Sequence, residues 1–475
     1  MNFEVENLVV GRGPVGVVTC LELLHKGQKV FNIDIGRDLS SLSQKFTVES
    51  NINYTGVLKL PSIVKDSNSH LWGGACMGWR FFENESTNDS QLPGLPIDKT
   101  KFKAACNRLV SLLNLTRFDF IKDKPKFGHL FKIPESLELI FAKIVRDPYL
   151  TKQINELESN LEYRFKDGMV VNDVKDLGSI LEINGVMAGT DVDFTIKAKR
   201  VFLAGGTLNN TRILLDSDLD IPAFHLLGKN LSDHISLPLT QIPSDDILKV
   251  ERLFGYKKAP RKTKLWPRIR LRNNVKFHSI LDSFCYVTDI EAISKLGNKL
   301  HMICRYIPYA RHFLRIKVKG NFQLNLFAEI LNTPKNAIEL NMNQKKLQIN
   351  FNLTEADRAE ISKIVTGYFE GLRELFETNL PDPTQGSSRL SELHLVQSGS
   401  HPSGTYRMSV SPNEGIINPN SELHKHRNIF VLGAGGFPRS AATHPTFTAM
   451  ALAVLSVNSI PWKNTPNILG NKWEM

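Results

Sequence analysis

Val9-Val10-Gly11-Arg12-Gly13-Pro14-Val15-Gly16 joins an apolar, strand-like run to a segment with helical periodicity. Upstream, Val5, Leu8, Val9 and Val10 indicate a short buried strand. Downstream, apolar residues recur every three or four positions, as on one face of a helix: Val17, Cys20, Leu21 and Leu24. This order predicts a strand, a glycine turn and a helix that ends at Gly27.

A second strand is expected from Lys29 to Ile35, with Asp34 near its end, about twenty residues after the glycines. Glycines permit a tight turn and close backbone approach, a helix N-terminus receives a pyrophosphate, and a carboxylate accepts a hydrogen bond from a ribose hydroxyl. The alternative is a glycine-containing turn without a ligand. We favour a dinucleotide site formed by Gly11, Gly13, Pro14, Val15, Gly16 and Asp34.

The length of 475 residues suggests two or three domains, and the apolar and charged fractions are those of an ordinary globular protein. A strand that begins almost at Met1 leaves no room for a signal peptide, and no apolar run approaches the length of a membrane span. A cytoplasmic location is therefore expected. The five cysteines are scattered and have neither metal-ligand nor disulfide-framework spacing, so we expect reduced thiols and no metal.

The formal charge of +11 is concentrated in one segment, residues 252–276, which holds ten basic residues and no acidic one. Within it, Arg268, Arg270 and Arg272 alternate with apolar residues, as on a half-buried strand with a basic face. A solvated face is the simpler interpretation, and an anion site for a phosphorylated, carboxylated or nucleotide-linked substrate is the sharper one. Nothing else in the chain resembles a nucleic-acid module, so no nucleic-acid partner is expected.

The strand-turn-helix pattern returns twice further along the chain. Short strands between residues 161 and 203, with turns at 167–168, 184–185 and 189–191, lead to a small-residue turn at Ala204-Gly205 and then a helix. Near the C-terminus, Asn428 to Leu432 enters a turn at Gly433-Ala434, and Pro445-Thr446 opens an apolar helix. The nucleotide-binding domain is therefore predicted to be assembled from separated segments, 1–238 and 396–475.

Residues 239–395 have a different pattern and are expected to form an inserted α+β substrate domain built on an antiparallel sheet. Strand-like runs span residues 322–330, 337–340 and 347–351, and Thr354 with Asp357 is positioned to cap a long helix. Residues 38–62 are polar and weakly periodic, as in a surface excursion. A crowded stretch of small and aromatic residues follows, in which backbone can approach a flat ligand closely; it includes His70, Trp72, Gly73 and Gly74.

Several of these stretches together resemble the glucose-methanol-choline (GMC) oxidoreductases, FAD enzymes that oxidise alcohols, and especially their sugar-dehydrogenase-like branch. The most specific segments are His401-Pro-Ser-Gly-Thr-Tyr-Arg-Met408 and Asn428 to Leu452. The glycine turns, Ser69 to Gly74 and Gly228-Lys-Asn-Leu-Ser-Asp-His234 are also similar to family segments. Residues 239–395 resemble the family only in their general pattern.

The resemblance implies an FAD cofactor and an alcohol or sugar substrate, which the basic segment allows to be anionic; no motif specifies the electron acceptor. It further implies that His401 is the general base and that His444 contacts the same hydroxyl. The helix that begins near Pro445 and Thr446 would then lie at the flavin's pyrimidine edge, with the glycine turns and Ser69 to Gly74 around the cofactor.

The sequence departs from the family pattern at three places. Lys65-Asp66 replaces a common glycine pair, Gly433 stands where an acid is frequent, and Asp34 replaces the usual Glu. A flavoprotein with a non-redox, lyase-like or structural use of FAD is therefore a second hypothesis. An NAD enzyme is a third, disfavoured because simple NAD modules are continuous in sequence.

Overall fold

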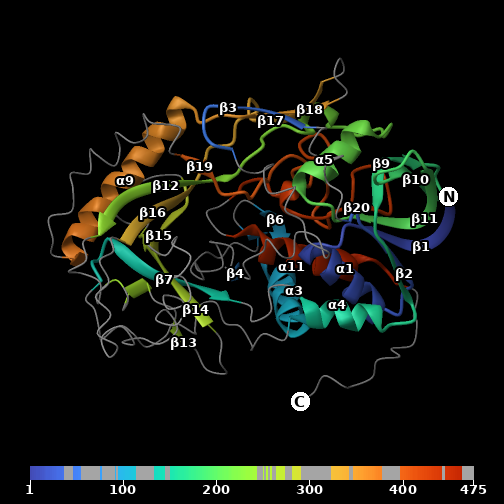
Figure 1. Cartoon of the computed structure of the whole chain (residues 1–475), viewed down its shortest axis with the longest axis horizontal. Coiled ribbons are helices and arrows are strands. Elements are labelled where there is room, and N and C mark those ends of the chain that lie inside the picture. Colours follow the sequence, from blue (N-terminus) through green and yellow to red (C-terminus); the bar gives the residue numbers. More distant parts are fainter. Residues whose placement is uncertain are drawn as a thin grey trace.

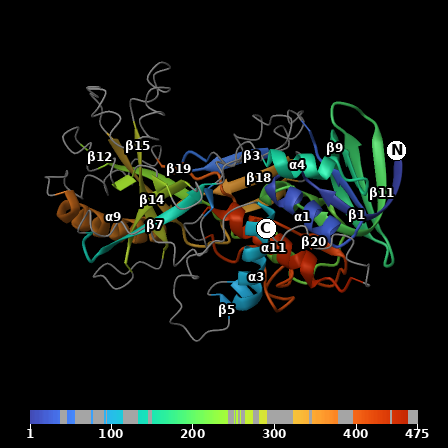
Figure 2. The ribbon, with the colours of Figure 1, turned by 90° about the horizontal axis from the view of Figure 1, so that it is seen from below.

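A computed structural model describes most of the chain (Figure 1). The described residues are 1–36, 46–54, 75–76, 91–92, 95–113, 133–144, 150–242, 250, 253–254, 257–258, 264–272, 281–289, 322–341, 346–376, 396–440 and 444–462. Figure 2 shows the sheet that carries the N-terminus, with several helices, on one side of the molecule, and another sheet with the long helix at residues 355–376 on the other side.

The first sheet has seven described strands in the order β8-β2-β1-β11-β10-β9, with β20 also paired to β11. Their bounds are Asn2–Val10 (β1), Val30–Ile33 (β2), Tyr163–Lys166 (β8), Met169–Asp176 (β9), Leu181–Met187 (β10), Asp193–Leu203 (β11) and Ile429–Val431 (β20). The pairings of β8, β2, β1, β11 and β20 are parallel, whereas β10 and β9 are antiparallel. The expected Rossmann-like α/β arrangement is confirmed.

Helices cover this sheet, and helices from near the two ends of the chain pack on each other. They are α1 (Pro14–His25), α3 (Lys99–Leu112), α4 (Thr151–Glu158) and α11 (Pro445–Ser459), with α5 (Thr207–Asp216) elsewhere on the domain (Figure 1). Helix α11 packs on α1 and α3. Buried Glu22 of α1 accepts hydrogen bonds from Arg108 Nε and Asn458 Nδ2, each at 2.9 Å. Helices α1 and α11 therefore belong to the same core.

The second sheet has eight described strands in the order β19-β12-β16-β15-β14-β7-β4, with β13 beside β14. Their bounds are Ala75–Cys76 (β4), Leu137–Ile144 (β7), His234–Ile242 (β12), Lys257–Lys258 (β13), Lys264–Leu271 (β14), Ser283–Asp289 (β15), Phe322–Glu329 (β16) and Gln397–Ser398 (β19). All its pairings are antiparallel, as expected. Strand β12 crosses the expected segment boundary at 238/239.

The helix α9 (Glu355–Phe376) packs against this sheet (Figure 1). Thr354 and Asp357 form the expected cap: Asp357 N–H donates to Thr354 Oγ1 at 3.1 Å, and Thr354 N–H donates to Asp357 Oδ2 at 2.8 Å. Asp357 also accepts from Leu331 N–H and ties the helix start to the end of β16.

The runs at 337–341 (β17, Ala337–Asn341) and 346–351 (β18, Lys346–Phe351) are antiparallel strands, as expected. They form a separate sheet, in which β3 (Phe46–Ser50) pairs parallel to β18. Strand β3 lies in the expected surface excursion; its polar composition reflects its place at the edge of that sheet. The pair Asn184-Gly185 is a bulge inside β10 and not a turn. A Cβ at Gly185 would overlap the Val170 carbonyl oxygen, so the glycine permits close strand contact.

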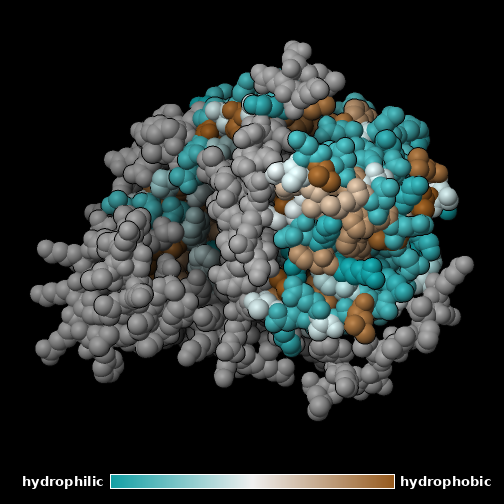
Figure 3. All heavy atoms as spheres, turned by 45° about the vertical axis from the view of Figure 1, so that its right-hand side comes forward, coloured by the Kyte–Doolittle hydropathy of each residue, from teal (hydrophilic) through white to brown (hydrophobic). Residues whose placement is uncertain are grey.

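The remaining short elements are β5 (Gln91–Leu92), β6 (Leu95–Asp98), η4 (Phe224–Leu226) and η9 (Ala434–Gly436). Figure 3 shows that the described residues on the face bearing the first sheet are mainly hydrophilic, with hydrophobic residues scattered between them. Among the described residues, no helix is long and apolar enough to cross a membrane. Cys20, Cys106 and Cys285 are buried free thiols, and burial raises the pKa of each.

Candidate active site

The expected glycine turn lies at the carboxyl ends of the parallel strands. Gly11 has a φ of 107°, and its N–H donates to the Ile33 carbonyl at 2.8 Å. A Cβ at Gly11 would lie 2.5 Å from the carbonyl oxygen of Ala204, in the second small-residue turn. Helix α1 begins at Pro14 without a side-chain cap. Its first N–H groups, which have no partner within the helix, are therefore not satisfied by a capping side chain.

Asp34 lies beside this turn at the end of β2. Its Oδ2 accepts from Arg12 N–H at 2.6 Å, and its Oδ1 accepts from Gly36 N–H at 3.0 Å. Burial raises the pKa of Asp34, while these two hydrogen bonds and the Arg12 charge oppose the rise. The Arg12 guanidinium stacks on Phe165 at 3.9 Å and pairs with Glu158 at 2.6 Å. The carboxylate is thus fixed next to the glycine turn, where a ribose hydroxyl could reach its remaining lone pairs.

Asn210 of α5 joins the second turn, at Ala204-Gly205, to a third turn, at Gly433-Ala434. Its Oδ1 accepts from Gly205 N–H, and its Nδ2 donates to the carbonyls of Leu203 and Leu432, all at 2.9 Å. The Tyr406 ring packs against the third turn so closely that a Cβ at Gly433 would lie 3.0 Å from its hydroxyl oxygen. The strands that lead to Ala204 and to Gly433-Ala434 therefore end side by side.

These residues fit FAD. The site has two helix N-termini without side-chain caps, those of α1 and α11, and the fixed carboxylate of Asp34. The three small-residue turns pack closely against one another. Two buried polar atoms in and before the first turns of α11, His444 Nε2 and Thr448 Oγ1, have no hydrogen-bond partner among the described residues. Orphaned polar atoms of this kind are typical of a site completed by a bound molecule. His70, Trp72, Gly73 and Gly74 lie outside the described residues.

Two short loops bring His401 to the edge of the second sheet. Ser232 and Ser403 exchange backbone hydrogen bonds, and Gly399 N–H donates to the His234 carbonyl. One oxygen of buried Asp233 accepts from the N–H groups of both His234, at 2.7 Å, and His401, at 2.9 Å. His401 is consequently held against the start of β12, with its Nδ1 at 3.2 Å from His234 Nδ1.

The structure also brings His401 and His444 together. Their ring centroids are 5.4 Å apart with the planes at 81°. His444 immediately precedes Pro445, the first residue of α11. Burial, assisted by the charges of Arg268 and His234, lowers the pKa of His444 to about 3. His444 is therefore neutral at physiological pH.

Aromatic side chains of the second sheet support the histidines. Phe327 of β16 packs against His234, His401 and His444, at centroid distances of 4.8, 6.1 and 5.9 Å. Phe284 of β15 contacts His444 at 6.1 Å. Both phenylalanines are buried, so they hold the three imidazoles in fixed orientations.

The three arginines of the predicted basic face have different surroundings. Arg268 is 1% exposed and stacks on Trp266 at 3.4 Å, with Phe284 at 5.2 Å. Arg270 donates from Nε to Glu138 at 2.7 Å, and Arg272 is exposed just beyond β14. The interpretation as a solvated basic face is therefore wrong for Arg268, because aromatic side chains of the sheet enclose it. The Phe284 ring contacts both Arg268 and His444.

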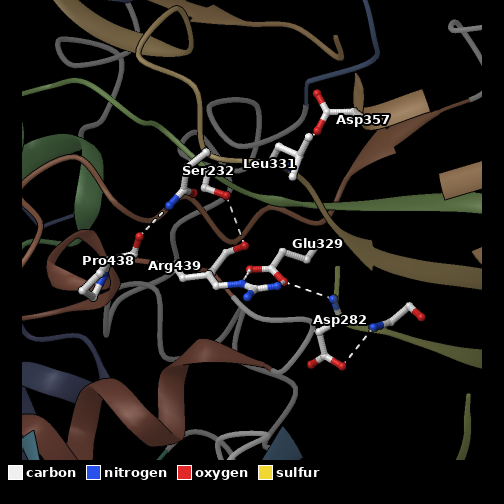
Figure 4. Close-up of polar contacts among 10 residues, drawn as sticks. Ser232, Asp282, Glu329, Leu331, Asp357, Pro438 and Arg439 are labelled. Atoms are coloured by element: carbon white, nitrogen blue, oxygen red, sulfur yellow. Dashed lines mark hydrogen bonds and ion pairs between the residues drawn. The ribbon is translucent and has the colours of Figure 1, made fainter. Parts of the chain in front are cut away.

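A clasp joins the loop before His444 to the second sheet (Figure 4). Arg439 donates from Nε and Nη2 to the two carboxylate oxygens of buried Glu329, at 2.7 and 2.8 Å. Ser232 Oγ donates to Ser440 Oγ at 3.1 Å, and Asn332 Nδ2 donates to the Pro438 carbonyl. The clasp is formed by side chains from both parts of the molecule and fixes the loop that leads to His444.

Sequence reasoning did not assign Asp233, His234 or Phe327 to the site, whereas Arg268 was already a candidate for an anion site. Asp233-His234 lies in a stretch that resembles the family, but its partner His401 is 167 residues away from His234. Asp233, His234 and His401 each offer a potential metal-ligand atom, all within 4.8 Å of one another. Because hydrogen bonds already join the three residues, we assign the cluster to hydrogen bonding.

Comparison with known proteins gives one family match and one similar fold. Residues 333–453 match the family model described as GMC oxidoreductase, and this segment contains both His401 and His444. None of the curated proteins compared matches the chain. The fold is similar to that of the crystal structure of pyridoxine 4-oxidase from Mesorbium loti, with a TM-score of 0.56 and 14% identity over 96% of this chain and 98% of that one. Residues 333–453 are thus similar to the GMC oxidoreductases, a family whose members bind FAD.

Proposed function

We propose that the protein oxidises the CH–OH group of an alcohol with FAD, with His401 as the general base. The observation that supports this most directly is the His401–His444 pair at 5.4 Å, in which the buried Nε2 of His444 has no hydrogen-bond partner within the part of the chain that the structure describes. An alcohol hydroxyl placed between the two rings could donate its proton to one and hydrogen-bond to the other. Bound FAD supplies the two-electron acceptor for the hydride that leaves the carbinol carbon.

The roles of the two histidines follow from their surroundings. A general base must hold a proton after the reaction, and a His with a pKa near 3 holds one poorly at neutral pH. His444 therefore orients the hydroxyl as a neutral hydrogen-bonding group. His401 takes the proton, a task that suits an imidazole near physiological pH.

The cofactor residues keep the roles suggested by the sequence. Gly11, Gly13, Val15 and Gly16 would surround the pyrophosphate at α1, and Asp34 would accept from the ribose. The uncapped start of α11 at Pro445 and Thr446 would stabilise negative charge on the cofactor through its free N–H groups and dipole. Ala204, Gly205, Gly433 and Ala434 would pack the neighbouring turns against it.

The substrate is proposed to carry a negative group. Arg268 is a buried cation linked to His444 through the Phe284 ring. A cation in a low-dielectric environment attracts an anion more strongly than an exposed one does. A carboxylated or phosphorylated alcohol is therefore favoured over a neutral one, with a sugar of the expected dehydrogenase branch as one case. A cytoplasmic location is also proposed, as is a division near 238/239 and 395/396 into an FAD-binding domain and a substrate domain, with strand β12 running across the first boundary.

Anaerobic flavin reduction tests the function. The purified protein, loaded with FAD, should be yellow, and an alcohol substrate should bleach its flavin absorbance under nitrogen. The panel should pair anionic and neutral alcohols and sugars, and air or a quinone should then be admitted to identify the acceptor. A yellow protein that no member of the panel bleaches would favour the non-redox alternative.

A further inference from the structure

The contact between His234 and His401 is a hydrogen bond between like atoms. The two Nδ1 atoms are 3.2 Å apart, and the rings meet at 79°. A neutral imidazole has one N–H and one bare nitrogen, so a bond between two neutral histidines requires one to donate and the other to accept. The direction of this bond determines which nitrogen of His401 remains basic.

The two directions have opposite consequences. If His234 donated, Nδ1 of His401 would accept, and the proton of His401 would lie on Nε2. If His401 donates from Nδ1, its Nε2 carries a lone pair and can take a proton. The nitrogen that is not engaged with His234 can therefore act as a base in only one of the two arrangements.

We propose that His234 is a positioning residue that accepts the Nδ1–H of His401 and so makes Nε2 of His401 the basic nitrogen. This inference rests on the function proposed above. In the proton transfer, the substrate O–H bond breaks and a new N–H bond forms at His401 Nε2, while the Nδ1 proton stays in place. His401 then becomes a cation, and its hydrogen bond to His234 becomes charge-assisted and stronger.

The surroundings of His234 suit a fixed acceptor. His234 is 1% exposed and packs on Phe327, and its backbone lies in the antiparallel pairing of β12 with β16 and β19. Asp233 holds the backbones of both histidines through one oxygen and lies close enough for its charge to stabilise the His401 cation. Both the geometry and the charge thus favour proton uptake at His401.

Two substitutions separate the hydrogen bond from packing. His234→Asn keeps an acceptor oxygen near the position of Nδ1, whereas His234→Leu fills similar space without an acceptor. The expected loss of the anaerobic flavin-reduction rate is about 10²-fold for His234→Leu and less than about 10-fold for His234→Asn. The substrate dissociation constant should change little in both. His424→Asn is the matched control, because the Nε2 atom of His424 contacts the Ser409 carbonyl oxygen at 3.1 Å.

The tautomer can be observed without turnover. In FAD-loaded protein with ¹⁵N-labelled histidines, long-range ¹⁵N–¹H correlation should show His401 protonated on Nδ1 and bare on Nε2, with His401→Gln used to assign the signal. A neutral His401 protonated on Nε2 would overturn the inference. So would equal reduction rates for the wild type and His234→Leu, or equal losses in His234→Leu and His234→Asn. If no alcohol bleaches the wild type, the proposed function fails, while the tautomer measurement still tests this inference.

Discussion

The imidazoles of His401 and His444 lie edge to face at 5.4 Å, although one is in a loop beside the second sheet and the other precedes the last helix. Their meeting depends on two attachments. The Thr207 hydroxyl of α5 donates to the Pro402 carbonyl at 2.6 Å, and the Arg439–Glu329 clasp fixes the loop that leads to His444. The candidate site is thus held from both sheets at once.

Replacing His401 with Gln should slow anaerobic flavin reduction by about 10²- to 10⁴-fold, because the hydroxyl proton loses its acceptor. FAD should remain bound, since His401 lies outside the glycine turns. Stopped-flow absorbance measures the rate, and the flavin-to-protein absorbance ratio measures occupancy. Fast reduction in the variant would remove His401 as the base.

Acid should destabilise the protein through His444. The folded protein binds its proton only near pH 3, whereas the unfolded chain binds it near pH 6.5, so between these values the unfolded state holds more protons. Stability therefore falls as the pH drops from 6.5 towards 3. His444→Asn should reduce the loss of unfolding free energy between pH 7 and pH 5 by about 2 kcal/mol. Urea denaturation of the wild type and of His444→Asn at the two pH values, with FAD in excess, measures this loss. Equal losses of unfolding free energy in the two proteins would contradict the low pKa of His444.

Arg268→Gln should raise KM for an anionic alcohol by about 10-fold or more and leave KM for its neutral analogue nearly unchanged, since only the anion loses an attractive charge. Arg270→Gln is the matched control on the same strand, because Arg270 is already paired with Glu138. Steady-state kinetics with both substrates give the comparison. Equal effects of the two substitutions would return Arg268 to a packing role.

Arg439→Met should lower the free energy of unfolding by about 3 kcal/mol, because it leaves buried Glu329 without its cation. The double variant Glu329→Met with Arg439→Met should recover most of that loss. The exposed pair Lys425–Asp220 provides a control, and Lys425→Met should change stability by less than about 1 kcal/mol. Urea denaturation measures all three, and a neutral Arg439→Met would show that the clasp contributes little.

Gly11→Ala should abolish FAD binding, since the added Cβ would lie 2.5 Å from the Ala204 carbonyl oxygen and force the two turns apart. Gly178→Ala is matched in backbone conformation, with a φ of 87°, but its Cβ would have no atom within 4 Å. It should cost about 1 kcal/mol of stability and retain FAD. Titration of the apoproteins with FAD distinguishes them, and normal affinity in Gly11→Ala would contradict the close packing of the turns.

Local patterns in the sequence were sufficient for the first strand, the helix from Pro14, the Thr354–Asp357 cap and the return of the chain at Pro445. Each depends on spacing within a few residues, and spacing reports local geometry well. Asn184-Gly185 was misread because a bulge and a hairpin turn use the same residues, and only the partner strand distinguishes them.

The amino-acid sequence was enough to predict a βαβ unit with a dinucleotide site in the first forty residues, and to place His401 and His444 in segments that resemble a flavoenzyme family. The packing of separate segments was needed to show that His234 contacts His401, that aromatic side chains enclose Arg268 and that Arg270 pairs with Glu138. Strand periodicity assigns a side chain to a face of a sheet, but the residues that cover that face come from other strands and loops. Glu138, which pairs with Arg270, and His401, which contacts His234, are each more than a hundred positions from their partners.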